Sequence, residues 1–200
     1  MYKRQVITHA IHYESYIYLH KQHEYSFPGG KATKMAYDEA IRLFNLYGMN
    51  NRNGDDIVVD SLGVGAGVCS FLSAAGYSVV RYLGGAASDN SNLYRCRRVQ
   101  SYLVARNYFR EGKIVIADEF VDQHEWDDVY AQLCSVRRKV GMERVEDLLT
   151  KEEMRNAGIT SPDRADSIAM QFATQSPMTV DVDLESVIMG NQLASAGYGI

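Results

Sequence analysis

Apolar and polar residues follow one another along the chain in short blocks whose spacing predicts alternating strands and helices. Residues 6–25 alternate roughly and are rich in Ile, Tyr and His, which predicts one or two strands before a turn at residues 28–30. Residues 57–59 form an apolar run that fits a buried strand ending on Asp60. Helices are predicted over residues 31–47, 90–111, 121–139, 151–156 and 162–174, with further strands over 77–82 and 113–117. This alternation predicts an α/β sheet domain.

The two ends of the chain differ from the middle. Residues 175–200 mix Ser, Asp, Gly and Asn without a sustained period, so we expect a flexible tail there. Residues 1–5, Met-Tyr-Lys-Arg-Gln, look like a translated sequencing adapter, so we expect an artefact with the true start of the protein upstream. The folded domain is therefore predicted to occupy residues 6–174.

Composition and charge narrow the range of functions. The 200 residues are 46% hydrophobic and 23% charged, which is typical of one globular domain. No run approaches the roughly 18 apolar residues of a membrane span, so no membrane partner is expected. Three distant cysteines make neither a zinc motif nor a disulfide framework, which favours a reducing, cytoplasmic compartment. Because the formal charge is −4, any DNA contact must come from a local basic patch.

Asp60 comes where the apolar strand meets a glycine-rich turn at residues 63–67. Ligand chemistry collects at the carboxyl ends of strands in open α/β sheets, and glycines there leave the carboxylate unobstructed. The alternative is that Asp60 only caps the next helix. The same glycines suit a nucleotide- or S-adenosylmethionine-binding loop, but such a loop needs an acidic residue at the end of the following strand, and no carboxylate comes there until Asp89.

A second pair of carboxylates starts a predicted helix. Ser161 and Pro162 are typical of the N-cap and the first helical position, and the helix dipole is an alternative explanation for Asp163. A spacing of three places Asp163 and Asp166 on one face of the helix, where Asp166 borders the apolar stripe. Two carboxylates in a partly desolvated place repel each other unless one is protonated or a cation binds between them. With Asp60 nearby, they suit one or two divalent ions for phosphodiester hydrolysis.

Basic residues recur along the predicted helix over residues 90–111. Arg95, Arg98, Arg106 and Arg110 have spacings that share a helix face, which fits sequence-independent contacts with DNA phosphates, although a solvated surface is the alternative. His20 and His23 are of a residue type that could share a metal ion. They are three residues apart, however, and in a strand this spacing places the two side chains on opposite faces of the sheet. We therefore expect both to be surface or packing residues.

Residues 57–67, the block 85–116 and the ending from Lys151 to Asp166 together resemble the nuclease domain of the tailed-phage terminase large subunit. The closing Lys-x-x-Met followed by Ser-Pro-Asp-x-Ala-Asp is the most specific part. The resemblance implies a ribonuclease-H-like mixed central sheet flanked by helices, and two Mg²⁺ or Mn²⁺ ions held by acidic residues that cut concatemeric double-stranded DNA. It places Asp60 at the end of the fourth strand and the last acid at Asp163 or Asp166. Lys151 matches a basic position before that helix.

Two features depart from this family pattern. The family's first catalytic acid lies on its first strand, whereas residues 6–25 match the second and third strands, so we expect the first strand and its acid to be missing. No phosphate loop of an ATPase motor occurs either. The resemblance then implies a nuclease domain that is inactive alone, with an upstream ATPase domain of the same polypeptide, a portal protein and a small terminase subunit as partners in the host cytoplasm. A nucleotide- or S-adenosylmethionine-binding enzyme and a catalytically silent DNA-docking module are the alternatives.

Overall fold

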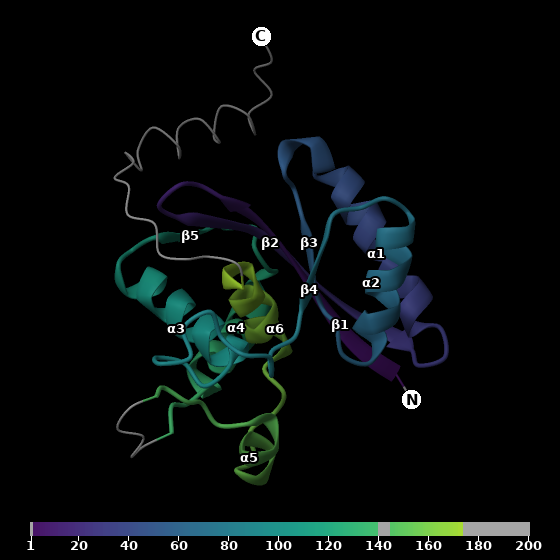
Figure 1. Ribbon diagram of the computed structural model, residues 1–200. Helices are drawn as coiled ribbons and strands as arrows, with labels where there is room; N and C mark the ends of the chain where they lie inside the picture. Colours follow the sequence, from purple (N-terminus) through teal and green to yellow (C-terminus); the bar gives the residue numbers. More distant parts are fainter. Residues whose placement is uncertain (1, 140–144, 174–200) are drawn as a thin grey trace.

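The strands of the protein form two separate sheets in a computed structural model that describes residues 2–139 and 145–173 (Figure 1). Strand β1 (Tyr2–His12) pairs antiparallel with β2 (Ile17–Pro28), and the short β5 (Ile114–Ile116) adds parallel to β2. Strand β3 (Ile57–Asp60) pairs parallel with β4 (Val79–Tyr82). Parallel and antiparallel pairs therefore occur together, as the predicted mixed sheet requires.

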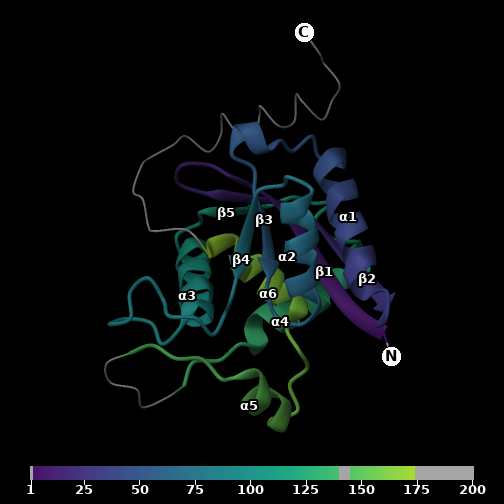
Figure 2. The same ribbon diagram turned by 45° about the vertical axis from the view of Figure 1, so that its right-hand side comes forward.

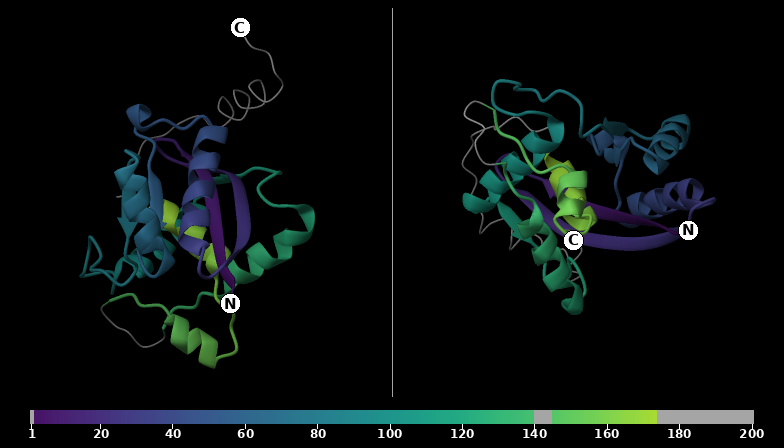
Figure 3. Two further views of the ribbon diagram at one scale, coloured as in Figure 1. Left: turned by 90° about the vertical axis from the view of Figure 1, so that its right-hand side faces the viewer. Right: turned by 90° about the horizontal axis from the view of Figure 1, so that it is seen from below.

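Helices cover both sides of these strands, and the views in Figures 1 and 2 agree on their placement. Helices α1 (Ala32–Leu46) and α2 (Val64–Ala74) lie beside β3 and β4, whereas α3 (Arg97–Arg110) and α4 (Trp126–Ser135) lie on the other side. Helix α6 (Asp163–Ala169) packs against β1, α3 and α4 (Figure 3). Short 3₁₀ turns lie at Asn51–Asn53, Gln123–Glu125 and Met170–Phe172, and α5 (Lys151–Asn156) projects at one end.

Each side of the strands has its own apolar core. Phe27 and Leu72 belong to the core between α1, α2 and the β3–β4 sheet. On the other side, Ile17, Phe120 and Phe172 are completely buried among α3, α4 and α6. Since burying one such side chain contributes about 1.5–3 kcal/mol, these cores fix the helices that border the space between the two sheets.

The predicted helix over residues 90–111 begins later than expected, at Arg97. Its first amides are captured by a preceding loop, because Arg97 N–H donates to the carbonyl of Ala86 and Arg98 N–H to that of Gly84. Arg95 lies before the helix, where its N–H donates to the carbonyl of Glu146. The helix expected over residues 121–139 is also shorter, because a 3₁₀ turn precedes α4 and the helix ends at Ser135.

The N-terminal residues belong to the folded domain. Residues 2–5, which the sequence analysis set aside, form the beginning of β1, where Tyr2 lies opposite Pro28. The tail expected over residues 175–200 lies outside the described residues. Across residues 2–139 and 145–173, no helix combines the length and the hydrophobicity that crossing a membrane requires.

Candidate functional site

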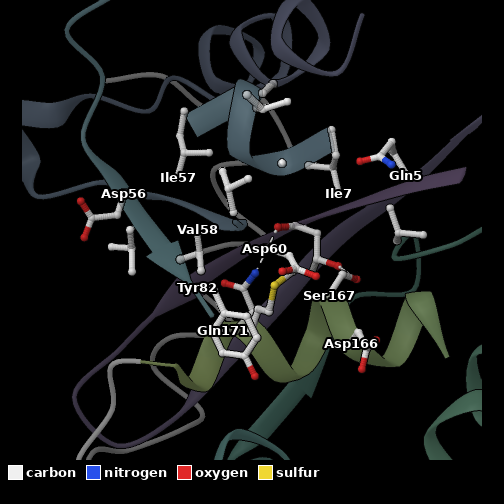
Figure 4. Close-up of a pocket in the computed structure, with 18 of the residues that line it drawn as sticks. Gln5, Ile7, Asp56, Ile57, Val58, Asp60, Tyr82, Asp166, Ser167 and Gln171 are labelled. Atoms are coloured by element: carbon white, nitrogen blue, oxygen red, sulfur yellow. Dashed lines mark hydrogen bonds between the residues drawn. The ribbon is translucent and has the colours of Figure 1, made fainter. Parts of the chain in front are cut away.

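A cavity of about 920 Å³ lies between the two sheets. Residues 3–12 of β1 line one wall and residues 55–60, at and before β3, line another. Helix α6 adds Asp163, Asp166 and Ser167 to the lining, and Figure 4 shows the end of β3 with Asp60 above this helix. The three carboxylates singled out from the sequence therefore border one cavity, although about a hundred residues separate Asp60 from the other two.

Asp60 does not cap the helix that follows it. Its Oδ1 atom accepts a hydrogen bond of 3.3 Å from the N–H of Leu62, while Gly63 occupies the N-cap position of α2. Gly63 has φ +57°, a left-handed conformation that favours glycine. The carboxylate at the end of β3 is thus left at the cavity wall rather than used in the helix.

The glycine-rich turn serves packing between α2 and β3. A Cβ atom on Gly65 would lie 1.7 Å from the backbone oxygen of Asp60, so the absence of a side chain allows the helix to sit on the end of the strand. A Cβ on Gly67 would approach Thr33 Cγ2 to 2.6 Å. These close contacts explain why glycines are needed in this turn even without a bound nucleotide. The glycine-rich turn therefore no longer supports the interpretation as a cofactor-binding loop.

Asp166 is surrounded by hydrogen-bond donors and cations. The hydroxyl of Tyr102 donates to its Oδ1 atom at 2.6 Å, and Arg98 Nε lies 3.6 Å from the same atom. Lys151 Nζ lies 2.7 Å from Oδ2. Burial, together with the carboxylate of Asp166, raises the pKa of Tyr102 well above its ordinary value, so the phenol remains a donor. The charge of Asp166 at the edge of the core is therefore compensated.

Asp163 has different partners from its neighbour one turn later. The hydroxyl of Ser161 donates to Asp163 Oδ1 at 2.6 Å, and Arg4 Nε lies 3.9 Å from Oδ2. The predicted N-cap role of Ser161 is wrong, because α6 begins after Pro162 and its N-cap makes no side-chain hydrogen bond. Ser161 orients the carboxylate instead.

Arg164 anchors α6 beneath the cavity and was missed in the sequence analysis. Its side chain is only 4% exposed and forms ion pairs with Glu24, Glu125 and Asp128. These contacts tie the helix that carries the two carboxylates to β2 and α4. The burial of Arg164 could have been inferred from its position in the sequence, because it lies four residues before Ile168 and so on the same face of the predicted helix as this apolar residue.

The four arginines do not form one basic stripe. Arg98 is half-buried against Asp166, with its guanidinium 5.0 Å from the centre of the Tyr102 ring. Arg95 lies outside α3, whereas Arg106 and Arg110 are exposed on it. The predicted shared face is therefore wrong for Arg95, and Arg98 serves the carboxylate site directly.

The carboxylates suit a hard divalent ion but do not by themselves complete its coordination. Carboxylate oxygens are preferred ligands of Mg²⁺ and Ca²⁺, and the ammonium of Lys151 already lies where a cation would meet Asp166 Oδ2. Within the part of the chain that the structure describes, no three His, Cys, Asp or Glu side chains converge closely enough to hold a metal. The donor chemistry fits, and the number of converging donors is too small.

The fold is similar to that of known terminase nuclease domains. The chain aligns with the nuclease domain of the large terminase subunit gp2 of bacterial virus Sf6, in a lysine-to-alanine mutant with manganese, at a TM-score of 0.61 and 18% identity, covering 86% of this chain and 88% of the other. A calcium form of that mutant gives 0.60 at 19% identity, covering 86% and 83%. The Sf6 nuclease domain itself gives 0.55 at 19%, covering 86% and 87%. No family model and no curated protein sequence matches the chain.

This likeness establishes the fold. The α/β class predicted from the sequence pattern is confirmed, and so is the ribonuclease-H-like mixed sheet with flanking helices that the resemblance implied. The resemblance to terminase nuclease domains, first drawn from short motifs, extends in three dimensions over most of the chain.

Proposed function

We propose that this domain is a metal-dependent nuclease that cuts concatemeric double-stranded DNA during viral genome packaging. The observation that carries the proposal is the cavity that Asp60, Asp163 and Asp166 all line, within a fold shared with terminase nuclease domains. Carboxylate oxygens favour Mg²⁺ or Mn²⁺. Manganese accompanies one of the similar nuclease domains, and calcium another.

The chain contributes carboxylates from two elements, β3 and α6, and the side chains that orient them. Together with one further acid, Asp60, Asp163 and Asp166 would hold two ions, which supply activation of the attacking water and stabilisation of the leaving oxygen when bound. Tyr102 orients Asp166 by donating a hydrogen bond to Oδ1, whereas Lys151 lies on Oδ2, where a bound ion would displace it.

Exposed cations on and near α3 and α5 would bind the DNA backbone. Arg106 and Arg110 lie exposed on α3, Arg95 is exposed just before it, and the Lys151 side chain is 54% exposed. Such groups neutralise phosphates without reading sequence, which makes binding weaken with salt. Arg98 would act mainly through Asp166, since it is held against that carboxylate.

One further strand would complete the domain between β1 and β3. Among the described residues, β1 pairs only with β2 and β3 only with β4, and the cavity follows ten consecutive residues of β1, or about 33 Å at ~3.3 Å per residue. Side-chain amides occupy two backbone acceptors of β1: Gln5 donates to the carbonyl of Arg4, and Gln171 to that of Thr8. An added strand would replace these contacts with a regular ladder.

The same strand would bring the carboxylate that the site lacks. The 200-residue chain alone is then expected to cleave DNA weakly or not at all. An upstream ATPase domain of the same polypeptide, a portal protein and a small terminase subunit in the host cytoplasm belong to this proposal, since they follow from the resemblance to packaging terminases.

Nicking of supercoiled plasmid in Mn²⁺ or Mg²⁺ tests the proposal. A chain extended upstream by an aspartate-bearing strand should nick DNA, while the same chain with Asp60→Asn or Asp166→Asn should not. Asp127→Asn, an exposed acid on α4, is the matched control and should retain activity. Equal cutting by the Asp60→Asn variant would show that the site is wrongly assigned.

Binding measurements separate the alternatives. Calorimetric titration with S-adenosylmethionine or ATP should give no binding to the chain, and saturable binding would favour the cofactor enzyme. Salt-dependent DNA binding that survives loss of all three aspartates, without cleavage by any extended chain, would instead indicate a silent docking module.

A further inference from the structure

Four aromatic rings from three elements gather beside the cavity, which His9 and Tyr47 line. His9 lies on β1, His20 and His23 lie on β2, and Tyr47 follows α1. The β1–β2 register changes between His9 and Ala10, which pair with Lys21 and Leu19, so that His20 is an extra residue in β2. This β-bulge brings His20 and His23 both to Tyr47, and the predicted opposite faces are therefore wrong.

His9 and His20 present the same kind of nitrogen to each other. Their Nδ1 atoms are 2.9 Å apart, and the two rings are nearly perpendicular, at 84°. The His9 ring is stacked on Tyr47, with centroids 4.1 Å apart and an interplanar angle of 5°. Two ring nitrogens are thus brought together by a bulge and by stacking that limits rotation of one ring.

The other nitrogen of His20 faces a carboxylate. His20 Nε2 lies 3.6 Å from Glu119 Oε1, an arrangement that favours the hydrogen on Nε2 and leaves the Nδ1 lone pair directed toward His9. A carboxylate in this outer position is common around metal-binding histidines, where it fixes the tautomer and the ring orientation.

The distance between the two Nδ1 atoms is close to that between two nitrogen ligands of one transition-metal ion. Metal–nitrogen distances near 2.0–2.1 Å place two ligands at right angles about 2.9 Å apart, and two tetrahedral ligands about 3.3 Å apart. The observed 2.9 Å equals the right-angle separation. The two rings would also turn so that both lone pairs point to the ion. Imidazole nitrogens suit Zn²⁺, Ni²⁺ and Cu²⁺, whereas carboxylates suit Mg²⁺ and Mn²⁺.

We propose that His9 and His20 form a second metal site, for a divalent transition ion, with Glu119 as the outer carboxylate. Within the described residues no third His, Cys, Asp or Glu side chain converges on the pair, so water completes the coordination. Binding moves the hydrogen of His9 from Nδ1 to Nε2, and neither neutral ring loses a proton. The ion would join β1 to β2 at the bulge, independently of the proposed nuclease chemistry.

Titration of the whole chain with Zn²⁺ and with Cu²⁺, in excess Mg²⁺ to saturate carboxylates, tests this site. Calorimetry should give one Zn²⁺ per chain, and electron paramagnetic resonance of bound Cu²⁺ should show coupling to two imidazole nitrogens. His9→Gln and His20→Gln should each abolish that two-nitrogen signal. Glu119→Gln should weaken Zn²⁺ binding about tenfold, as loss of an outer carboxylate commonly does.

His124→Gln is the matched control, because His124 is exposed in a separate 3₁₀ turn. This variant should bind Zn²⁺ and Cu²⁺ like the unchanged chain, and circular dichroism should show that every variant is folded. Absence of saturable Zn²⁺ binding, or an unchanged Cu²⁺ signal in folded His9→Gln and His20→Gln, would overturn the proposal. Neither result depends on DNA cleavage, so it leaves the proposed function to its own test.

Discussion

Lys151 Nζ lies 2.7 Å from Asp166 Oδ2, and this contact joins the first residue of α5 to α6. The lysine side chain is 54% exposed and the aspartate 20% exposed, so the ion pair is at the edge of the cavity rather than inside the core. A pair in such a place contributes about 0–1 kcal/mol, which a divalent ion on the same oxygen would readily exceed.

Replacing Lys151 with Met should therefore tighten Mn²⁺ binding to the chain. Removal of a competing contact worth up to about 1 kcal/mol corresponds to an increase in affinity of up to ~5-fold. Calorimetric titration with Mn²⁺ measures the change. Lys34→Met, which removes an exposed lysine–carboxylate pair with Asp38 on α1, should leave the affinity unchanged. Weaker binding by Lys151→Met would mean that the lysine supports the ion instead of competing with it.

Gly65→Ala should destabilise the whole domain. The added Cβ would meet the backbone oxygen of Asp60 at 1.7 Å, and neither the strand end nor the helix start can move without disturbing the other. Overpacking of this kind costs about 1–3 kcal/mol or more, to be measured by urea unfolding. Gly30→Ala is the control, because its Cβ meets nothing within 4 Å. Equal stability of the two variants would show that α2 does not depend on this close approach.

The free energy of unfolding should fall as the pH drops from about 6.5 to about 4. Burial, followed by the charges of His20 and His23, lowers the pKa of His9 to about 4, with Asp55 opposing the shift. Between the two pKa values the unfolded chain binds the additional proton, so stability rises with pH across this window, by at most ~1.4 kcal/mol per pH unit for one group. Burial also lowers the pKa of His12, which acts in the same direction.

Urea unfolding at several pH values should give a shallower slope for His9→Gln than for the unchanged chain. His124→Gln should retain the original slope, since that residue is exposed in another part of the fold. A His9→Gln slope identical to that of the unchanged chain would assign the pH dependence to other groups.

Features with a local cause could be predicted from the sequence. The apolar run predicted the strand Ile57–Asp60 with Asp60 at its end, because period and strand length are properties of a few neighbouring residues, although the strand is half-buried rather than buried. The spacing of three between Asp163 and Asp166 likewise placed both on the cavity side of α6.

Features with a distant cause could not be predicted. Helix α3 begins at Arg97 because carbonyls of residues 84 and 86 take its first amides, and these partners are known only after the loop has folded. The bulge places His20 on the same side of β2 as His23, and no pattern in the neighbouring residues predicts this bulge. Arg164 is buried because Glu24, Glu125 and Asp128 surround it from other elements.

The division of the strands into two sheets has a mechanical consequence. Asp60 is carried by the β3–β4 sheet, whereas Asp163 and Asp166 are carried by a helix packed on β1. A cation bound by Asp60 and by an aspartate of α6 would therefore link the two sheets, which share no hydrogen-bonded strands among the described residues. In the 200-residue chain, removing such an ion with a chelator should therefore let the two sheets move more freely relative to each other, with or without any cleavage of DNA.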